Sequence, residues 1–148
     1  MKETYYHGRG YHGLRDIAQT GRIQGFEIDD EDIFPEMRVE KEVHGKQNAV
    51  WITDSVESAK VYAWGGGYLE IDPENIKVTD DSTSCYSVVM RDSISIDHVD
   101  RIMIEENTTN PSNPQPDLGL EVANLLDREF KDIEIGYYSP ERYEINVD

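Results

Sequence analysis

The sequence is poor in cysteine and in apolar runs. Cys85 is its single cysteine, whereas a small secreted domain would more often carry paired cysteines. No apolar run approaches the roughly 18 residues that a transmembrane helix needs, and residues 1–10, MKETYYHGRG, contain no apolar core of the signal-peptide kind. We therefore expect a cytoplasmic protein without membrane contact, in which Cys85 is a small packed side chain rather than a catalytic thiolate.

Basic residues are also scarce. The chain has 14 Lys and Arg against 31 Asp and Glu, which gives a net charge of −17. Such a surface repels nucleic-acid backbones and anionic membranes, and it attracts basic partners. We therefore expect no direct binding of nucleic acid and a basic protein as the partner. A solvated acidic surface that only keeps the protein soluble has the same composition.

The 148 residues are enough for one domain, 1–148, with a buried core. Apolar alternation and β-rich runs predict short strands, while apolar residues at helical spacing predict helices. Strands outnumber helices in a mixed order, which indicates an α+β fold with a split, mostly antiparallel sheet and a few short helices. The strands are expected at 4–7, 50–52, 68–71, 76–78, 86–90, 101–104, 133–135 and 143–145, and the helices near 14–20, 56–63 and 118–126.

Local signals mark the ends of the first two helices. Asp54 followed by Glu57 matches the capping-box pattern at the start of the helix 56–63. Gly21 is expected to end the first helix and Gly65-Gly66-Gly67 the second, because glycine adopts positive φ without steric cost.

A long loop is expected before the strand at 50–52. The segment 26–46 holds the acidic run 29–32 and reads as loop, with a short strand at 37–43. Such a loop can act as a lid over a pocket. A solvated insertion explains it equally well.

A His-Gly-Arg sequence follows the first predicted strand. Gly8 lets a ligand approach the backbone closely, the His7 imidazole offers a directed hydrogen bond, and Arg9 can bind a phosphate in bidentate fashion. Each also has a simpler explanation, since a strand-end histidine is often a satisfied structural residue and an arginine is often a surface residue. His12 repeats the His-Gly pair, but no Cys or carboxylate stands at a convincing ligand spacing, so we expect no metal site.

An aromatic residue and several carboxylates complete the candidates. Tyr62 lies on the helix 56–63 beside apolar neighbours, where its ring either stacks on a planar heterocycle or belongs to the core. Glu141, Glu144 and Asp80 lie next to predicted strands. A carboxylate of this kind can stabilise positive charge that develops at the anomeric carbon of a ribose, although most carboxylates in so acidic a chain lie on the surface.

Together these pieces resemble the ADP-ribosyltransferase fold of the diphtheria-toxin and PARP type. In that superfamily a first strand carries a Tyr-His-Gly run, here 6–8, and a later strand ends in a Ser/Thr-containing turn, here at Thr53. The following helix bears an A..YA pattern, here 59–63, and a strand similar to Y.YEID comes next, here 68–72. The resemblance covers less than half of the chain, and it extends to small bacterial and phage enzymes that include the rifamycin-modifying and the anti-CRISPR transferases.

The resemblance implies that NAD is the substrate and that no metal takes part. By it, His7 contacts the nicotinamide-side ribose, Gly8 clamps the carboxamide through its backbone, and Tyr62 stacks on the nicotinamide ring. The reaction breaks the nicotinamide–ribose bond through an oxocarbenium-like transition state, which orientation and electrostatics stabilise. The other expected site residues are Tyr6, Arg9, Thr53 and, as the catalytic carboxylate, Glu144, with Glu141 and Asp80 as alternatives. The chain departs from the family at Arg9, where Ser or Thr is usual, and at 84–87, which offers no carboxylate.

Three functions are compatible with these observations. The first is an NAD-dependent ADP-ribosyltransferase that modifies a basic protein, such as a host or defence protein if the chain is phage-encoded and acts in the host cytoplasm. The second is a non-catalytic acidic inhibitor that covers a basic, nucleic-acid-binding surface of a partner. The third, removal of a phosphate from RNA on the same fold, ranks last because it needs a basic pocket.

Overall fold

The computed structural model describes residues 4–27, 48–63, 66–80, 86–106 and 118–138. In this part of the chain eight strands form one sheet, and a short two-stranded sheet lies beside it. The helices are α1 (Tyr11–Thr20), α3 (Val56–Ala63) and α4 (Leu118–Glu129), with a 3-10 turn, η2, at Ile96–His98. No helix among the described residues is long and apolar enough to cross a membrane.

The main sheet is almost entirely antiparallel. Its order is β10-β9-β5-β1-β4-β7-β6, and β3 pairs with β4 outside this path. The β9–β10 pair is parallel, and the other pairs are antiparallel. These strands are β1 (Tyr5–Arg9), β3 (Phe26–Glu27), β4 (Asn48–Thr53), β5 (Gly67–Ile71), β6 (Val78–Asp80), β7 (Tyr86–Val89), β9 (Val99–Glu105) and β10 (Glu134–Tyr138). The predicted α+β class with a mostly antiparallel sheet is confirmed.

The sheet is split where β1 meets β4. The strands β1 and β5 pair along five residues, but β1 and β4 share the single pair Tyr6–Thr53. Beyond Tyr6 the two strands diverge, so the backbone edge of Gly8 and Arg9 that faces β4 lies outside their pairing. Buried backbone groups along such a gap need other hydrogen-bond partners, which side chains, water or a ligand can supply.

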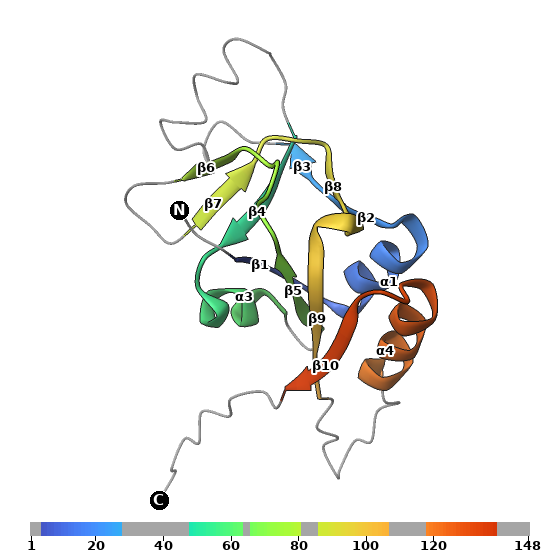
Figure 1. The fold of residues 1–148 in the computed structure, drawn as a ribbon. Coiled ribbons are helices and arrows are strands. Elements are labelled where there is room, and N and C mark those ends of the chain that lie inside the picture. The colour runs from blue at the N-terminus through green and yellow to red at the C-terminus, as the bar shows by residue number, and fades with distance from the viewer. Residues whose placement is uncertain (1–3, 28–47, 64–65, 81–85, 107–117, 139–148) are drawn as a thin grey trace, which may run out of the picture.

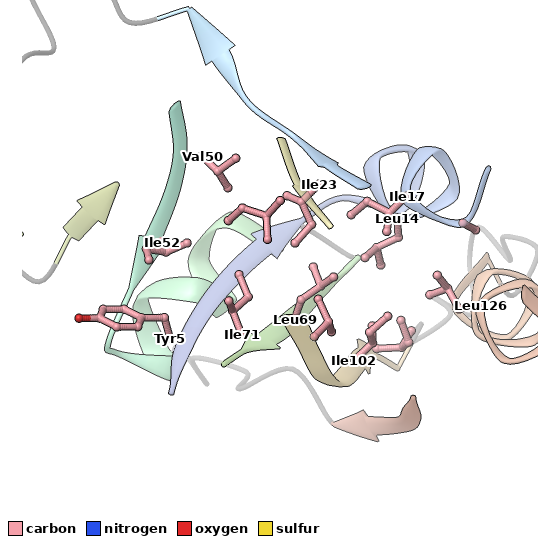
Figure 2. Close-up of a cluster of buried hydrophobic side chains, with 14 of the residues drawn as sticks. Tyr5, Leu14, Ile17, Ile23, Val50, Ile52, Leu69, Ile71, Ile102 and Leu126 are labelled. Carbon is pink, nitrogen blue, oxygen red and sulfur yellow. The ribbon is translucent and has the colours of Figure 1, made fainter. Parts of the chain in front are cut away.

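The core lies between the sheet and the helices α1 and α4. Residues on a strand point alternately to its two faces, and Tyr5 of β1 faces this core together with Ile52 of β4 and Ile71 of β5. The labelled side chains of the strands and of both helices gather in one cluster (Figure 2). Helices α1 and α4 lie side by side on one side of the molecule, and α3 lies apart from them (Figure 1).

Helix α3 packs closely on β1 because small residues face each other. Ala59 and Ala63 are buried, and a Cβ placed on Gly8 would collide with the carbonyl oxygen of Ala59. The helix begins after Ser55, whose hydroxyl oxygen accepts a hydrogen bond from the Ser58 amide at 3.2 Å. The N-cap predicted at Asp54 is therefore wrong by one residue.

Several further boundaries differ from those predicted. The strand expected at 76–78 starts at Val78, because Ile76 follows a turn in which Asn75 has φ 64°. The loop predicted at 26–46 begins with the strand β3. The strands β2 (Arg22–Gln24) and β8 (Ser93–Ser95), which pair with each other, were not predicted.

The predicted glycine turn has another physical basis than positive φ. Among the described glycines only Gly21 has positive φ, so the reason given for Gly66 and Gly67 is wrong. Added side chains there would collide with the carbonyl oxygens of Arg9 and Met103, so close backbone approach requires glycine. The predicted strands at 37–43 and 143–145 lie outside the described residues.

Candidate functional site

A cavity of about 510 Å³ opens at the split between β1 and β4. Its size lies within the range of about 300–1,000 Å³ that is typical of small-molecule and cofactor sites. It is lined by the strands β1 and β4 and the helix α3, and β2 and β3 contribute one residue each. The lining residues are Tyr6, His7, Gly8, Arg9, Gly10, Gln24, Phe26, Val50, Trp51, Ile52, Thr53, Ala59 and Tyr62.

His7 stands in the gap between the two strands. Its Nδ1 lies 2.6 Å from the carbonyl oxygen of Trp51, and because a carbonyl can only accept, Nδ1 carries the proton. Burial, with a smaller contribution from the charge of Arg9, lowers the pKa of His7 to about 4, although the Trp51 hydrogen bond opposes the shift. The imidazole is therefore neutral at physiological pH, and its buried Nε2 is a hydrogen-bond acceptor with no partner among the residues that the structure describes.

Arg9 supplies a positive charge to the same cavity. Its Nη2 donates to the carbonyl oxygen of Gln24 at 2.5 Å, and its guanidinium carbon lies 5.2 Å from the ring centroid of Phe26. Its Nε is buried and has no hydrogen-bond partner within the described part of the chain. Burial lowers the pKa of Arg9 and the charge of Asp16 opposes this, but a guanidinium stays protonated in proteins.

Tyr62 is presented to the cavity by α3. The side chain is 55% exposed, so the core position considered for Tyr62 from the sequence is wrong. Its Cβ lies 3.0 Å from the place that a Cβ on Gly8 would occupy. The absence of a side chain at Gly8 thus allows α3, which carries Tyr62, to pack against β1.

The remaining predicted binding residues, Tyr6, Gly8 and Thr53, also line the cavity. Each of them also has a structural role within the fold. Gly8 is required by the approach of α3, as described above. The hydroxyl oxygen of Thr53 accepts a hydrogen bond from the Ser55 amide at 3.0 Å, which orders the turn into α3. The ring of Tyr6 packs edge-on against Tyr68, with centroids 5.9 Å apart and an interplanar angle of 77°.

The carboxylate candidates do not join this group in the described part of the chain. Asp80 lies on β6, which β7 separates from β4 in the sheet. Glu141 and Glu144 lie outside the described residues, as does Cys85. None of the described lining residues is Asp or Glu. A search of the described residues found no group of three His, Cys, Asp or Glu that could hold a metal ion.

Sequence reasoning missed three polar or aromatic lining residues, Gln24, Phe26 and Trp51. Trp51 was recognised only as part of a strand. Gln24 and Phe26 are in strands of two or three residues whose partners lie far along the chain, in β8 and β4. No local pattern could have identified them as cavity residues.

The cavity combines a neutral hydrogen-bond acceptor, a cation and aromatic rings. His7 Nε2 suits a ligand hydroxyl, Arg9 suits an anionic group, and Tyr62, Trp51 and Phe26 suit flat rings. Comparisons with protein-family models, with curated proteins and with solved structures gave no match. Functional conclusions therefore rest on the residues of the cavity.

Proposed function

We propose that this protein binds NAD in the cavity at the β1–β4 split and transfers ADP-ribose to a basic protein. The observation that supports this most strongly is the neutral, buried His7, whose Nε2 has no partner among the described residues and shares one cavity with Tyr62 and Arg9. A ribose hydroxyl donates to His7 Nε2. The nicotinamide ring stacks on Tyr62, and the phosphates are attracted by Arg9.

The transfer is a substitution at the anomeric carbon of the ribose. The bond from C1′ to the nicotinamide nitrogen breaks, its electron pair stays with that nitrogen, and nicotinamide leaves as a neutral molecule. A nucleophilic side chain of the target then bonds to C1′ and releases its proton to solvent. Holding ring and ribose in fixed positions lowers the barrier by orientation. Glu144, or Glu141 in its place, is our candidate for the carboxylate that stabilises the developing positive charge.

The acidic surface favours a basic acceptor. At a net charge of −17, the protein attracts positively charged targets over long distances. If the chain is encoded by a phage, a host or defence protein with a basic surface is the target that we propose.

Variants of His7 and Tyr62, with one control outside the cavity, test NAD binding and turnover. The side-chain amide of an asparagine at position 7 lies near the position of Nδ1, so His7→Asn keeps the hydrogen bond to Trp51 but loses the Nε2 acceptor. We expect nicotinamide release to fall at least about tenfold in this variant. Tyr62→Ala should weaken NAD binding by calorimetry about tenfold, and Tyr62→Phe should retain it because the ring remains. Tyr137→Ala, an exposed ring on β10 outside the cavity lining, is the control. Unchanged NAD turnover in both His7→Asn and Tyr62→Ala would reject the site.

A second function is favoured by the charge alone. A non-catalytic acidic inhibitor would form a complex with a basic partner that weakens steeply with salt. Incubation with labelled NAD and a host lysate separates the two functions, because transfer labels a protein and inhibition does not. A salt-sensitive complex that survives both His7→Asn and Tyr62→Ala, without labelling, would support the inhibitor.

A further inference from the structure

Phe26 is an apolar side chain that lines the cavity and is left largely exposed. It is 61% exposed, although β3 fixes its backbone by pairing Phe26 with Ala49 of β4. A ring in such a place is suited to hold a flat ligand group.

The guanidinium of Arg9 is fixed between Phe26 and the backbone. It rests over the Phe26 ring at 5.2 Å, and the Gln24 carbonyl holds one of its amino groups. Its Nε remains buried, and no described residue bonds to it. Among the described residues no carboxylate lies within ion-pair distance of Arg9, so its charge is left for an anionic group of a ligand.

The two exposed rings lie on opposite sides of β1. Tyr62 approaches Gly8, and Arg9 with Phe26 follows one residue later. Successive residues of a strand point to opposite faces, and a Cβ on Gly13 of α1 would lie 2.9 Å from the Arg9 side chain, which places Arg9 on the α1 side. Arg9, Phe26 and Tyr62 all line the same cavity, so one ligand can contact both rings and the cation.

We propose that Arg9 and Phe26 form a second subsite that binds the nucleoside diphosphate half of the ligand. The purine stacks on the part of the Phe26 ring that Arg9 does not cover, and the diphosphate accepts hydrogen bonds from the guanidinium. This inference rests on the proposed function, which identifies the other half of the ligand as the nicotinamide nucleoside of NAD. At position 9, where the resembling family usually has Ser or Thr, this chain has an arginine, and a guanidinium can bind phosphate.

ADP is the probe for this subsite, because it lacks the nicotinamide half. We expect calorimetry to show ADP binding to the full chain, weakened about tenfold or more in Phe26→Ala and close to wild type in Phe26→Tyr. Arg9→Gln should weaken ADP binding to a similar extent and reduce its dependence on salt. Tyr137→Ala and Arg128→Gln, exposed residues that do not line the cavity, are the matched controls and should bind ADP as the wild type does.

Adenosine and inorganic pyrophosphate separate the two halves of the subsite. Phe26→Ala should weaken binding of adenosine more than of pyrophosphate, and Arg9→Gln should do the reverse. If Arg9→Gln proves less stable by thermal unfolding, Phe26→Ala still decides, because its ring is already exposed. Absence of ADP binding by the wild type, or ADP binding unaffected by both substitutions, would overturn the subsite.

Turnover of NAD distinguishes this proposal from the proposed function. If ADP binding depends on Arg9 and Phe26 but nicotinamide is never released, the subsite stands and the transfer is wrong. If NAD is consumed with an unchanged KM in Phe26→Ala and Arg9→Gln, the transfer stands and the subsite is wrong.

Discussion

The imidazole of His7 joins Trp51 across the gap between β1 and β4, with Nδ1 donating to the Trp51 carbonyl oxygen at 2.6 Å. The His7 side chain thus supplies a hydrogen bond between β1 and β4 where their backbones are no longer paired. The same bond fixes the tautomer, so that Nε2 presents a lone pair to the cavity. Structural and ligand-binding roles thus coexist in one ring, and a substitution at position 7 must be chosen to separate them.

Acid should destabilise the protein through His7. The pKa of His7 is about 4 in the folded chain and 6.5 in the reference state, so between these values the unfolded chain binds more protons. His7's contribution is therefore fully present above about pH 6.5 and is lost as pH falls toward about 4. From pH 7 to pH 5 we expect the free energy of unfolding to fall by about 2 kcal/mol more in the wild type than in His7→Asn, measured by urea unfolding. Carboxylates titrate in both proteins, so parallel pH profiles would contradict the buried neutral imidazole.

Gly8→Ala should impair both stability and ligand binding. The new methyl group collides with the Ala59 carbonyl oxygen, and overpacking of this kind costs about 1–3 kcal/mol. Relief of the collision moves α3, which carries Tyr62, so NAD affinity should fall as well. Chemical unfolding and calorimetry measure the two effects. Wild-type stability in Gly8→Ala would mean that α3 does not pack against β1 as closely as described.

Gly21 provides a conformational test without any collision. Its φ is 69° at the end of α1, and an added Cβ would meet nothing within 4 Å. Gly21→Ala should therefore cost about 1 kcal/mol of stability through the left-handed backbone alone. Gly21→Asn should cost less, because Asn tolerates this conformation. Equal losses in both variants would point to a cause other than backbone conformation.

The N-terminus of α3 should depend on Ser55. Ser55→Ala removes the acceptor of the Ser58 amide and should lower the free energy of unfolding by about 1 kcal/mol. Ser55→Thr keeps a hydroxyl and should restore most of this stability. Thermal or urea unfolding of the pair measures the difference. A neutral effect of Ser55→Ala would place the cap elsewhere.

Strands and helices with strong local patterns were predictable from the sequence. Val50-Trp51-Ile52 and Tyr68-Leu69-Glu70-Ile71 lie within β4 and β5, and Gly21 ends α1. Each of these depends on β-propensity, apolar spacing or glycine φ, which are properties of a few neighbouring residues. The three helices were found for the same reason.

Other features could not be predicted because residues far apart in the chain create them. The strands β2 and β3 exist through pairing with β8 and β4, and Gly66 must be glycine because the backbone of Arg9 approaches it. The cap at Ser55 rather than Asp54 follows from the turn that Thr53 orders after β4. In each case a partner distant in sequence, or the exact path of a turn, outweighs the local pattern.

By itself, the sequence determined the α+β class and the acidic composition, since propensity, short-range spacing and residue counts carry that information, and its resemblance to a known superfamily grouped His7, Gly8 and Tyr62. Only the tertiary structure decided that β1 and β4 diverge after one residue pair, that burial keeps His7 neutral, and that Phe26 lies against Arg9. These features depend on strand register and burial, which arise when distant segments pack together.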